Sequence, residues 1–212
     1  MKNFAEFLGT YLLVSAVIGS GIMAENLSNG NIGVALLANT IATGSILFVI
    51  IKMFGPISGA HFNPVVSLVF FLRRELALNN LIQYIVVQII GGYLAVLTTH
   101  YIFNISIFQI STNIRGEWPL FVSEVIATMG LILTILFFMK HDKNSVALGV
   151  ALFICAGYWF TSSTSFANPA VTFARIFTDT FTGIAPISVS YFLFGQIIGS
   201  ILGFRIFIFF NN

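Results

Sequence analysis

Stretches of apolar residues, separated by short polar turns, run along the whole chain. A helix needs about 20 apolar residues to cross the hydrocarbon core of a bilayer. Six stretches reach or approach that length, which predicts six membrane-spanning helices. They are Phe4–Met23, Ile32–Met53, Leu81–Phe103, Pro119–Met139, Val146–Phe160 and Ile187–Phe210.

Two further stretches are predicted to be re-entrant. Gly55–Phe71 follows the second span and is too short, and too interrupted by glycine and proline, to cross on its own. Thr161–Phe177 follows the fifth span and repeats its Asn-Pro pattern. Non-helical backbone is tolerated at membrane depth only where protein buries it or it lines a wet cavity. We therefore predict an all-α membrane protein of six transmembrane helices plus two re-entrant half-helices.

Each re-entrant stretch contains an Asn-Pro box, and a helix is expected to start there. Asparagine accepts a hydrogen bond from the first free N–H groups of a helix, and proline fits the first helical position. Each box therefore predicts a half-helix of about ten residues, roughly 15 Å long. The boxes are Asn63-Pro64-Val65 and Asn168-Pro169-Ala170.

The two halves of the chain repeat one another. The asparagines of the boxes are 105 positions apart (168 − 63) in a chain of 212 residues, and other polar residues inside spans also pair. Because each half holds three spans, we predict one domain (1–212) built as an inverted repeat, with halves of about 1–105 and 117–212. The paired residues are Glu6 with Glu124 and Gln88 with Gln196.

Composition supports a membrane protein and excludes several other classes. Only 8% of the residues are charged and the mean hydropathy is +0.98, far from the roughly 25% charged residues of soluble domains. The net charge of +2 gives no sign of nucleic-acid binding. A single cysteine, Cys155, excludes an intramolecular disulfide, and no histidine pair has metal spacing. We therefore expect no metal and no cofactor.

Basic residues in the loops predict the orientation. With a cytoplasmic N-terminus, six basic residues fall inside and two, Arg115 and Arg175, fall outside. We therefore expect a multi-pass protein of the cell membrane with both termini in the cytoplasm. The inner set is Lys2, Lys52, Arg73, Arg74, Lys140 and Lys143.

The half-helices predict a pore. In an inverted repeat two helices of about 15 Å meet near the midplane, with Asn63 and Asn168 facing one another. Their positive dipole ends repel cations, and their amide N–H groups can hold a passing oxygen atom. Such a pore would pass neutral hydroxylated molecules and reject protons and metal cations.

The paired boxes, with AEFLGT in the first span and QIIGG and QIIGS in the third and sixth, resemble the aquaporin or major intrinsic protein family across essentially the whole chain. The resemblance implies a right-handed six-helix bundle, a homotetramer in the lipid bilayer with one pore per subunit, and no enzymatic activity. NPAVTFAR followed by DTFTGI resembles a bacterial branch associated with arsenic resistance. That branch implies passage of larger neutral solutes, arsenic species among them.

The chain departs from the family pattern at the selectivity filter. Val65 ends the first box in place of alanine, and Val171 follows the second box where most members have arginine. Counting from the boxes predicts a filter that is wider and uncharged, with Gly157 as the neighbour of one position if the count slips by one. The predicted filter residues are Thr43, Ala156, Ser165 and Val171.

Several residues have two interpretations from the sequence alone. Arg175, one helical turn beyond Val171, either replaces the missing filter charge or extends to the outer surface. His61 either gates the cytoplasmic approach by protonation or lines it as a partly wet group. Glu6 and Glu124 act either in a proton relay or, as the symmetry favours, as acceptors for the re-entrant loops, with Gln88 and Gln196 in packing and hydrogen-bonding roles.

Two other functional classes remain as alternatives to a passive channel for water, glycerol-like polyols and urea. A secondary transporter also uses inverted repeats and broken helices, but it needs ligands for a coupling ion, and no aspartate lies within a predicted span. A membrane enzyme is the third class, although the chain contains neither HExxH nor GxSxG.

Overall fold

The computed structural model describes residues 1–211, and all regular structure within them is helical. Six helices are long and apolar enough to cross a membrane, the fifth of them together with the turn before it. This result confirms the predicted fold class. The six are α1 (Lys2–Leu27), α2 (Ile32–Ser58), α4 (Leu78–Ile102), α5 (Trp118–His141), α6 (Val146–Phe160) and α8 (Val189–Phe209).

Two short helices lie between the long ones, and each starts directly after an asparagine of a box. These are α3 (Pro64–Leu72) and α7 (Pro169–Ala174). The Asn63 side chain accepts a hydrogen bond from the Val65 amide at 3.0 Å, and that of Asn168 accepts one from the Ala170 amide at 2.9 Å. The prediction that each Asn-Pro pair starts a helix is confirmed, and the reason is the capping chemistry.

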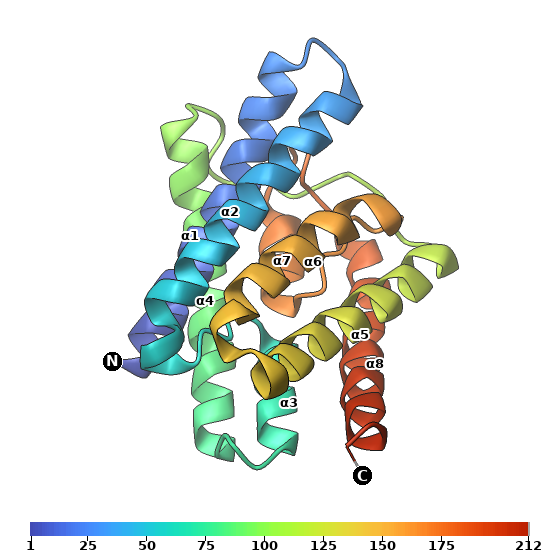
Figure 1. Ribbon diagram of the computed structural model, residues 1–212. Helices are drawn as coiled ribbons and strands as arrows, with labels where there is room; N and C mark the ends of the chain where they lie inside the picture. Colours follow the sequence, from blue (N-terminus) through green and yellow to red (C-terminus); the bar gives the residue numbers. More distant parts are fainter. Residues whose placement is uncertain (212) are drawn as a thin grey trace.

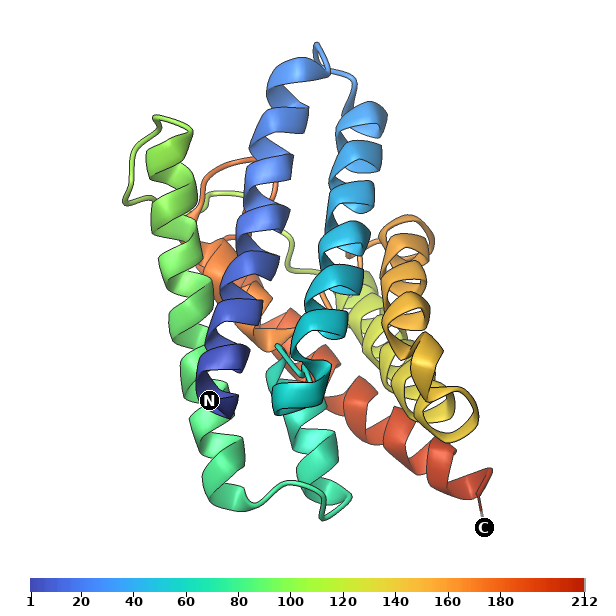
Figure 2. The same ribbon diagram turned by 60° about the vertical axis from the view of Figure 1, so that its left-hand side comes forward.

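The helices form two groups with the same element order. In the first group α1 packs against both α2 and α4, and in the second α5 packs against α8 and α6. The groups meet where α2 packs on α6, and α3 and α7 lie between them (Figure 1). The N-terminus and the end of α8 lie at the end of the bundle that carries the α3–α4 turn, opposite the α1–α2 turn (Figure 2).

Glycines let the long helices approach closely inside each group. A Cβ atom at Gly91 of α4 would lie 2.5 Å from the backbone carbonyl oxygen of Phe7 in α1. At Gly199 of α8 it would lie 2.4 Å from the carbonyl oxygen of Val125 in α5. Small residues at such contacts drive helix association in membranes, where lipid competes equally for larger apolar side chains.

Two predicted boundaries were wrong. The first re-entrant stretch begins later than Gly55, because α2 continues through Pro56 to Ser58 and ends only at Gly59, whose φ of +93° suits a residue without a Cβ. The second half-helix is shorter than about ten residues. It has six α-helical residues, followed by the 3₁₀ turn Arg175–Phe177.

The outer surface of the bundle is apolar. Large hydrophobic side chains from several long helices are exposed, for example Phe48, Ile82, Ile126, Leu152 and Phe194. A continuous exposed apolar surface of this kind matches a lipid environment, so the chain is a multi-pass membrane protein.

Candidate functional site

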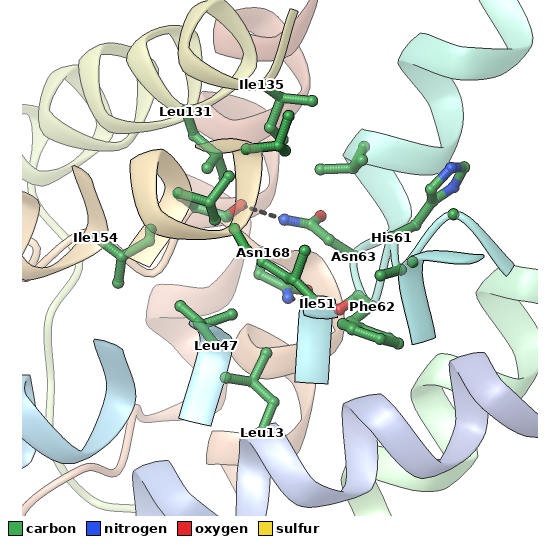
Figure 3. Close-up of a pocket in the computed structure, with 18 of the residues that line it drawn as sticks. Leu13, Leu47, Ile51, His61, Phe62, Asn63, Leu131, Ile135, Ile154 and Asn168 are labelled. Carbon is green, nitrogen blue, oxygen red and sulfur yellow. Dashed lines mark hydrogen bonds between the residues drawn. The ribbon is translucent and has the colours of Figure 1, made fainter. Parts of the chain in front are cut away.

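The two Asn-Pro boxes hold each other at the centre of the molecule. The Asn63 amide nitrogen donates to the carbonyl oxygen of Ala167 at 2.7 Å, and the Asn168 amide nitrogen donates to that of Phe62 at 2.8 Å. Figure 3 shows the two side chains converging among Leu47, Leu131 and Ile154. Each amide nitrogen carries a second N–H, for which residues 1–211 supply no acceptor.

The backbone before each asparagine is shaped to make these bonds. Phe62 and Ala167, the residues that supply the two acceptor carbonyls, both have a φ of +47°. Left-handed backbone costs a residue with a side chain about 1–2 kcal/mol. The same conformation also occurs three residues before each asparagine, at Ala60 and Ser165, and four residues before, at Gly59 and Thr164.

Glu6 stabilises the first loop. Its buried carboxylate accepts hydrogen bonds from the backbone amides of His61 at 2.9 Å and Phe62 at 2.6 Å. It also accepts one from the Ser58 hydroxyl at 2.6 Å and one from the Gln88 amide at 2.8 Å. The two backbone amides would otherwise be buried without a partner, so the carboxylate satisfies part of the non-helical backbone at membrane depth.

Glu124 makes the corresponding contacts in the second half. It accepts hydrogen bonds from the backbone amides of Phe166 at 3.0 Å and Ala167 at 2.9 Å, and from the Gln196 amide at 2.6 Å. Gln196 also donates to the Thr172 hydroxyl at 2.8 Å. Both carboxylates therefore accept hydrogen bonds from loop amides, the role that the symmetry of the sequence favours.

A cavity of about 440 Å³ lies along both boxes, and its lining includes Lys52 and Lys143 as well as Arg175. Its walls are largely aliphatic, and the asparagines are the polar groups near its middle. Of the two boxes only the asparagines line it, and Pro64, Val65, Pro169 and Ala170 do not. All the predicted filter residues except Ala156 line it. Its lining includes Leu13, Thr43, Leu47, Lys52, His61, Asn63, Leu131, Ile135, Lys143, Ile154, Tyr158, Ser165, Asn168, Val171 and Arg175.

At the end of the cavity that Arg175 lines, α6 contributes Tyr158 and not Ala156. Ala156 is exposed on the outer face of α6 and does not line the cavity. The Tyr158 hydroxyl lies 3.1 Å from the Thr43 hydroxyl oxygen and links α6 to α2. A count from the second box missed this register, but Val150, Ile154 and Tyr158 recur every fourth residue, which puts them on one helix face.

Arg175 lies inside the protein, which corrects the expectation of an uncharged filter. The residue is only 4% exposed, and its Cζ atom stacks 3.5 Å from the ring centroid of Phe166. Its Nε–H donates to the carbonyl oxygen of Thr182. Arg175 lines the cavity together with Ser165 and Val171. It lies one helical turn after Val171, the residue that directly follows the second box.

A second arginine, which is half-buried, lies at this end of the molecule, and the sequence did not predict its role. Arg115 comes from the polar connection between α4 and α5, and its Cζ atom lies 5.0 Å from the Phe166 ring centroid. Burial lowers the pKa of Arg115, and the Glu124 carboxylate acts in the opposite direction. Its only signal in the sequence was a lone arginine in an outer loop.

The end of the cavity near the α5–α6 turn carries His61 and two lysines, Lys52 and Lys143. His61 is buried at the start of the first loop, and its Nδ1 lies 3.0 Å from the Ser67 hydroxyl oxygen. Lys52 donates to the carbonyl oxygen of Asn144 at 2.8 Å, which ties α2 to the α5–α6 turn. His61 thus lines the cavity, a position that both of its interpretations require.

Within residues 1–211 no group of three histidine, cysteine or acidic side chains could hold a metal ion.

The thiol of Cys155 points toward α2, where its Sγ lies 3.6 Å from the carbonyl oxygen of Thr40. Cys155 is therefore a packing residue at the contact between α2 and α6.

Known proteins are similar to this chain in sequence and in fold. The profile of the family described as "Major intrinsic protein" matches residues 1–154, which include the first box and end before the second. Aquaglyceroporin AqpS of Rhizobium meliloti (strain 1021) is 45% identical over 197 residues, which is 93% of this chain and 84% of that protein. A probable TIP-type aquaporin of Medicago truncatula is 31% identical over 184 residues, which is 81% of this chain and 72% of that protein.

Among solved structures, the X-ray structure of the aquaglyceroporin from Plasmodium falciparum matches with a TM-score of 0.74. The match covers 100% of this chain and 95% of that chain at 20% sequence identity. At this identity the likeness concerns the fold.

Proposed function

This chain belongs to the major intrinsic protein family, and on that premise we propose that it is a passive channel for water and glycerol-like neutral solutes. The observation that carries the proposal is the cavity that passes both Asn-Pro boxes. The aquaglyceroporin name of the Rhizobium meliloti relative supports the inclusion of glycerol. Urea and neutral arsenic hydroxides, which are also small hydrogen-bonding solutes, belong to the class to be tested.

The mechanism follows from the two asparagines and the walls around them. A solute oxygen atom accepts the remaining N–H of Asn63 and then that of Asn168, while its carbon side lies against aliphatic side chains. The N-termini of both half-helices face this point, so their dipoles oppose a cation. The amides thus select oxygen-bearing neutral molecules without binding them tightly enough to stop flow.

We propose that the outer filter consists of Thr43, Tyr158, Ser165, Val171 and Arg175. Arg175 supplies N–H donors and a positive charge, and the hydroxyl groups supply acceptors on the other side of the cavity. Val171 keeps an aliphatic wall at the position after the second box. This arrangement suits a polyol, whose hydroxyl groups lie along one side of a carbon chain.

Charges and family membership support a position and an assembly. We infer that the protein lies in the inner membrane with both termini in the cytoplasm. Arg73, Arg74, Lys140 and Lys143 lie in turns at the end of the bundle that carries the termini, and basic loop residues favour the cytoplasmic side. We also infer a homotetramer of single-domain subunits, each with its own pore between repeats 1–105 and 117–212. Chemical cross-linking in membranes tests the assembly by its largest discrete product.

The experiment that tests the channel is light scattering of proteoliposomes. A sorbitol gradient measures water efflux, and glycerol or urea gradients measure the re-swelling that follows solute entry. We expect faster shrinkage than in empty vesicles, followed by re-swelling with glycerol. Permeabilities equal to those of empty vesicles, or saturable uptake that depends on an ion gradient, would refute the proposal, the latter in favour of a coupled transporter.

A further inference from the structure

One aromatic ring at the outer end of the pore is in contact with two guanidinium groups. The Cζ atom of Arg175 lies 3.5 Å from the ring centroid of Phe166, and that of Arg115 lies 5.0 Å from it. The two charges are therefore no further apart than the sum of these distances. Of these two arginines Arg175 lines the cavity and Arg115 does not, so the Phe166 ring lies between Arg115 and the cavity-lining guanidinium.

Hydrogen bonds hold Arg115 in this place. Its Nη2 donates to the carbonyl oxygen of Ser163 at 3.0 Å and lies 3.4 Å from the hydroxyl of Thr164. Its backbone amide donates to the hydroxyl of Ser188 at 2.8 Å, and its guanidinium also lies 5.7 Å from the ring centroid of Phe192. The connection between α4 and α5 thus carries the side chain inward to the second re-entrant loop.

No carboxylate neutralises either arginine through an ion pair within residues 1–211. Glu124 is the nearest buried acid, and its oxygens are occupied by the amides of Phe166, Ala167 and Gln196. Three further acids lie at this end of the molecule: Glu117 is exposed, Asp179 accepts hydrogen bonds from Thr112, and Glu25 accepts one from the Phe181 amide at 3.2 Å. This end of the cavity therefore has two positive charges close together, one buried at Arg175 and one half-buried at Arg115.

We propose that Arg115 is a remote selectivity residue, whose charge adds to the barrier against cations without contact with the permeating solute. The proposal rests on the proposed channel function. A partly buried charge is screened less by salt than an exposed one, so the Arg115 charge acts on an ion in the pore across the Phe166 ring. A neutral solute has no net charge for this field to act on.

The test compares proton leak with water flow in the same proteoliposomes. A trapped pH-sensitive dye reports protons, and light scattering reports water. We expect R115M, which keeps an apolar stem against Phe166, to raise proton leak per channel by on the order of tenfold, as loss of one charge at such a distance implies. Water permeability should change less than twofold, and R115K, which keeps the charge, should leak as little as the wild type.

Controls separate charge from structure. E117Q removes an exposed charge from the same connection and should leave both readings unchanged. R175M changes a cavity-lining residue and should alter water flow and proton leak together. R115Q keeps a donor for the Ser163 carbonyl and replaces R115M in the comparison if that variant is not recovered folded.

Two results would overturn the proposal. Proton leak that stays at the wild-type level in R115M or R115Q would show that the charge does not reach the pore. Leak that rises equally in R115K would assign the effect to the shape of the guanidinium. If the wild-type protein shows no water flow above empty vesicles, the channel function itself fails, which is a different result from either of these.

Discussion

Replacing Glu124 by glutamine changes one side-chain atom from an acceptor into a donor at the base of the second re-entrant loop. In the wild-type protein one oxygen accepts the Phe166 amide, and the other accepts both the Ala167 amide and the Gln196 side chain. A glutamine has a single oxygen and an NH₂ group. At least one of the three N–H donors would then face another donor.

The expected cost follows from that count. A buried donor without a partner costs about 1–3 kcal/mol, and a bond to a charged acceptor is stronger than one to a neutral acceptor. For a protein of this length, 1 kcal/mol corresponds to roughly 2–4 °C in melting temperature. We therefore expect E124Q to melt about 2–12 °C below the wild type. E6Q should lose at least as much, because the Glu6 carboxylate accepts from four donors.

The assay is thermal unfolding of detergent-purified protein, followed by the loss of the monodisperse peak in size-exclusion chromatography. E117Q is the matched control, since Glu117 is exposed and the same charge is removed. Melting temperatures of E6Q and E124Q that both lie within about 1 °C of E117Q and the wild type would refute the reasoning. The loop amides would then not depend on ionised carboxylates.

Three further predictions concern the pore and its walls. Y158F removes the hydroxyl that faces Thr43, so it should lower the free energy of unfolding by about 0.5–1.5 kcal/mol. A double-mutant cycle with T43V should show coupling between the two positions, and additive effects would contradict the contact. G199A forces a methyl group against a backbone carbonyl oxygen 2.4 Å away and should destabilise by about 1–3 kcal/mol, whereas G55A, with nothing within 4 Å, should not lower the melting temperature. N168D replaces the amide donor with a carboxylate oxygen that faces the carbonyl oxygen of Phe62. Light scattering should then show water and glycerol permeabilities at least about tenfold below those of the wild type. Wild-type permeability in N168D would contradict the role of the amide.

The fold followed from local features of the sequence. Span length needs only a run of apolar residues, and each half-helix start needs only the capping asparagine and the proline after it. The pairing of Glu6 with Glu124 was visible because the two halves repeat. All of these features are independent of how distant side chains pack.

The outer filter depended on geometry that a count of residues does not contain. Each residue along a helix turns the side chain by about 100°, so an error of two residues points it to nearly the opposite face. A count across the irregular loop 161–168 made such an error and placed Ala156 where Tyr158 lies. The left-handed residues of that loop break any simple relation between number and direction. Arg115 was out of reach because its contacts join a connection between spans to a loop about 50 residues later.

The crossed bonds between the boxes also have a consequence for biosynthesis. Asn63 and the Phe62 carbonyl lie in the half of the chain that is made first, and both their partners, Ala167 and Asn168, come from the half made last. An unpaired polar group in the hydrocarbon core costs several kcal/mol. The two crossed hydrogen bonds of the first re-entrant loop therefore cannot form until residues 167 and 168 have been synthesised, so the centre of the pore is completed by the C-terminal half of the chain.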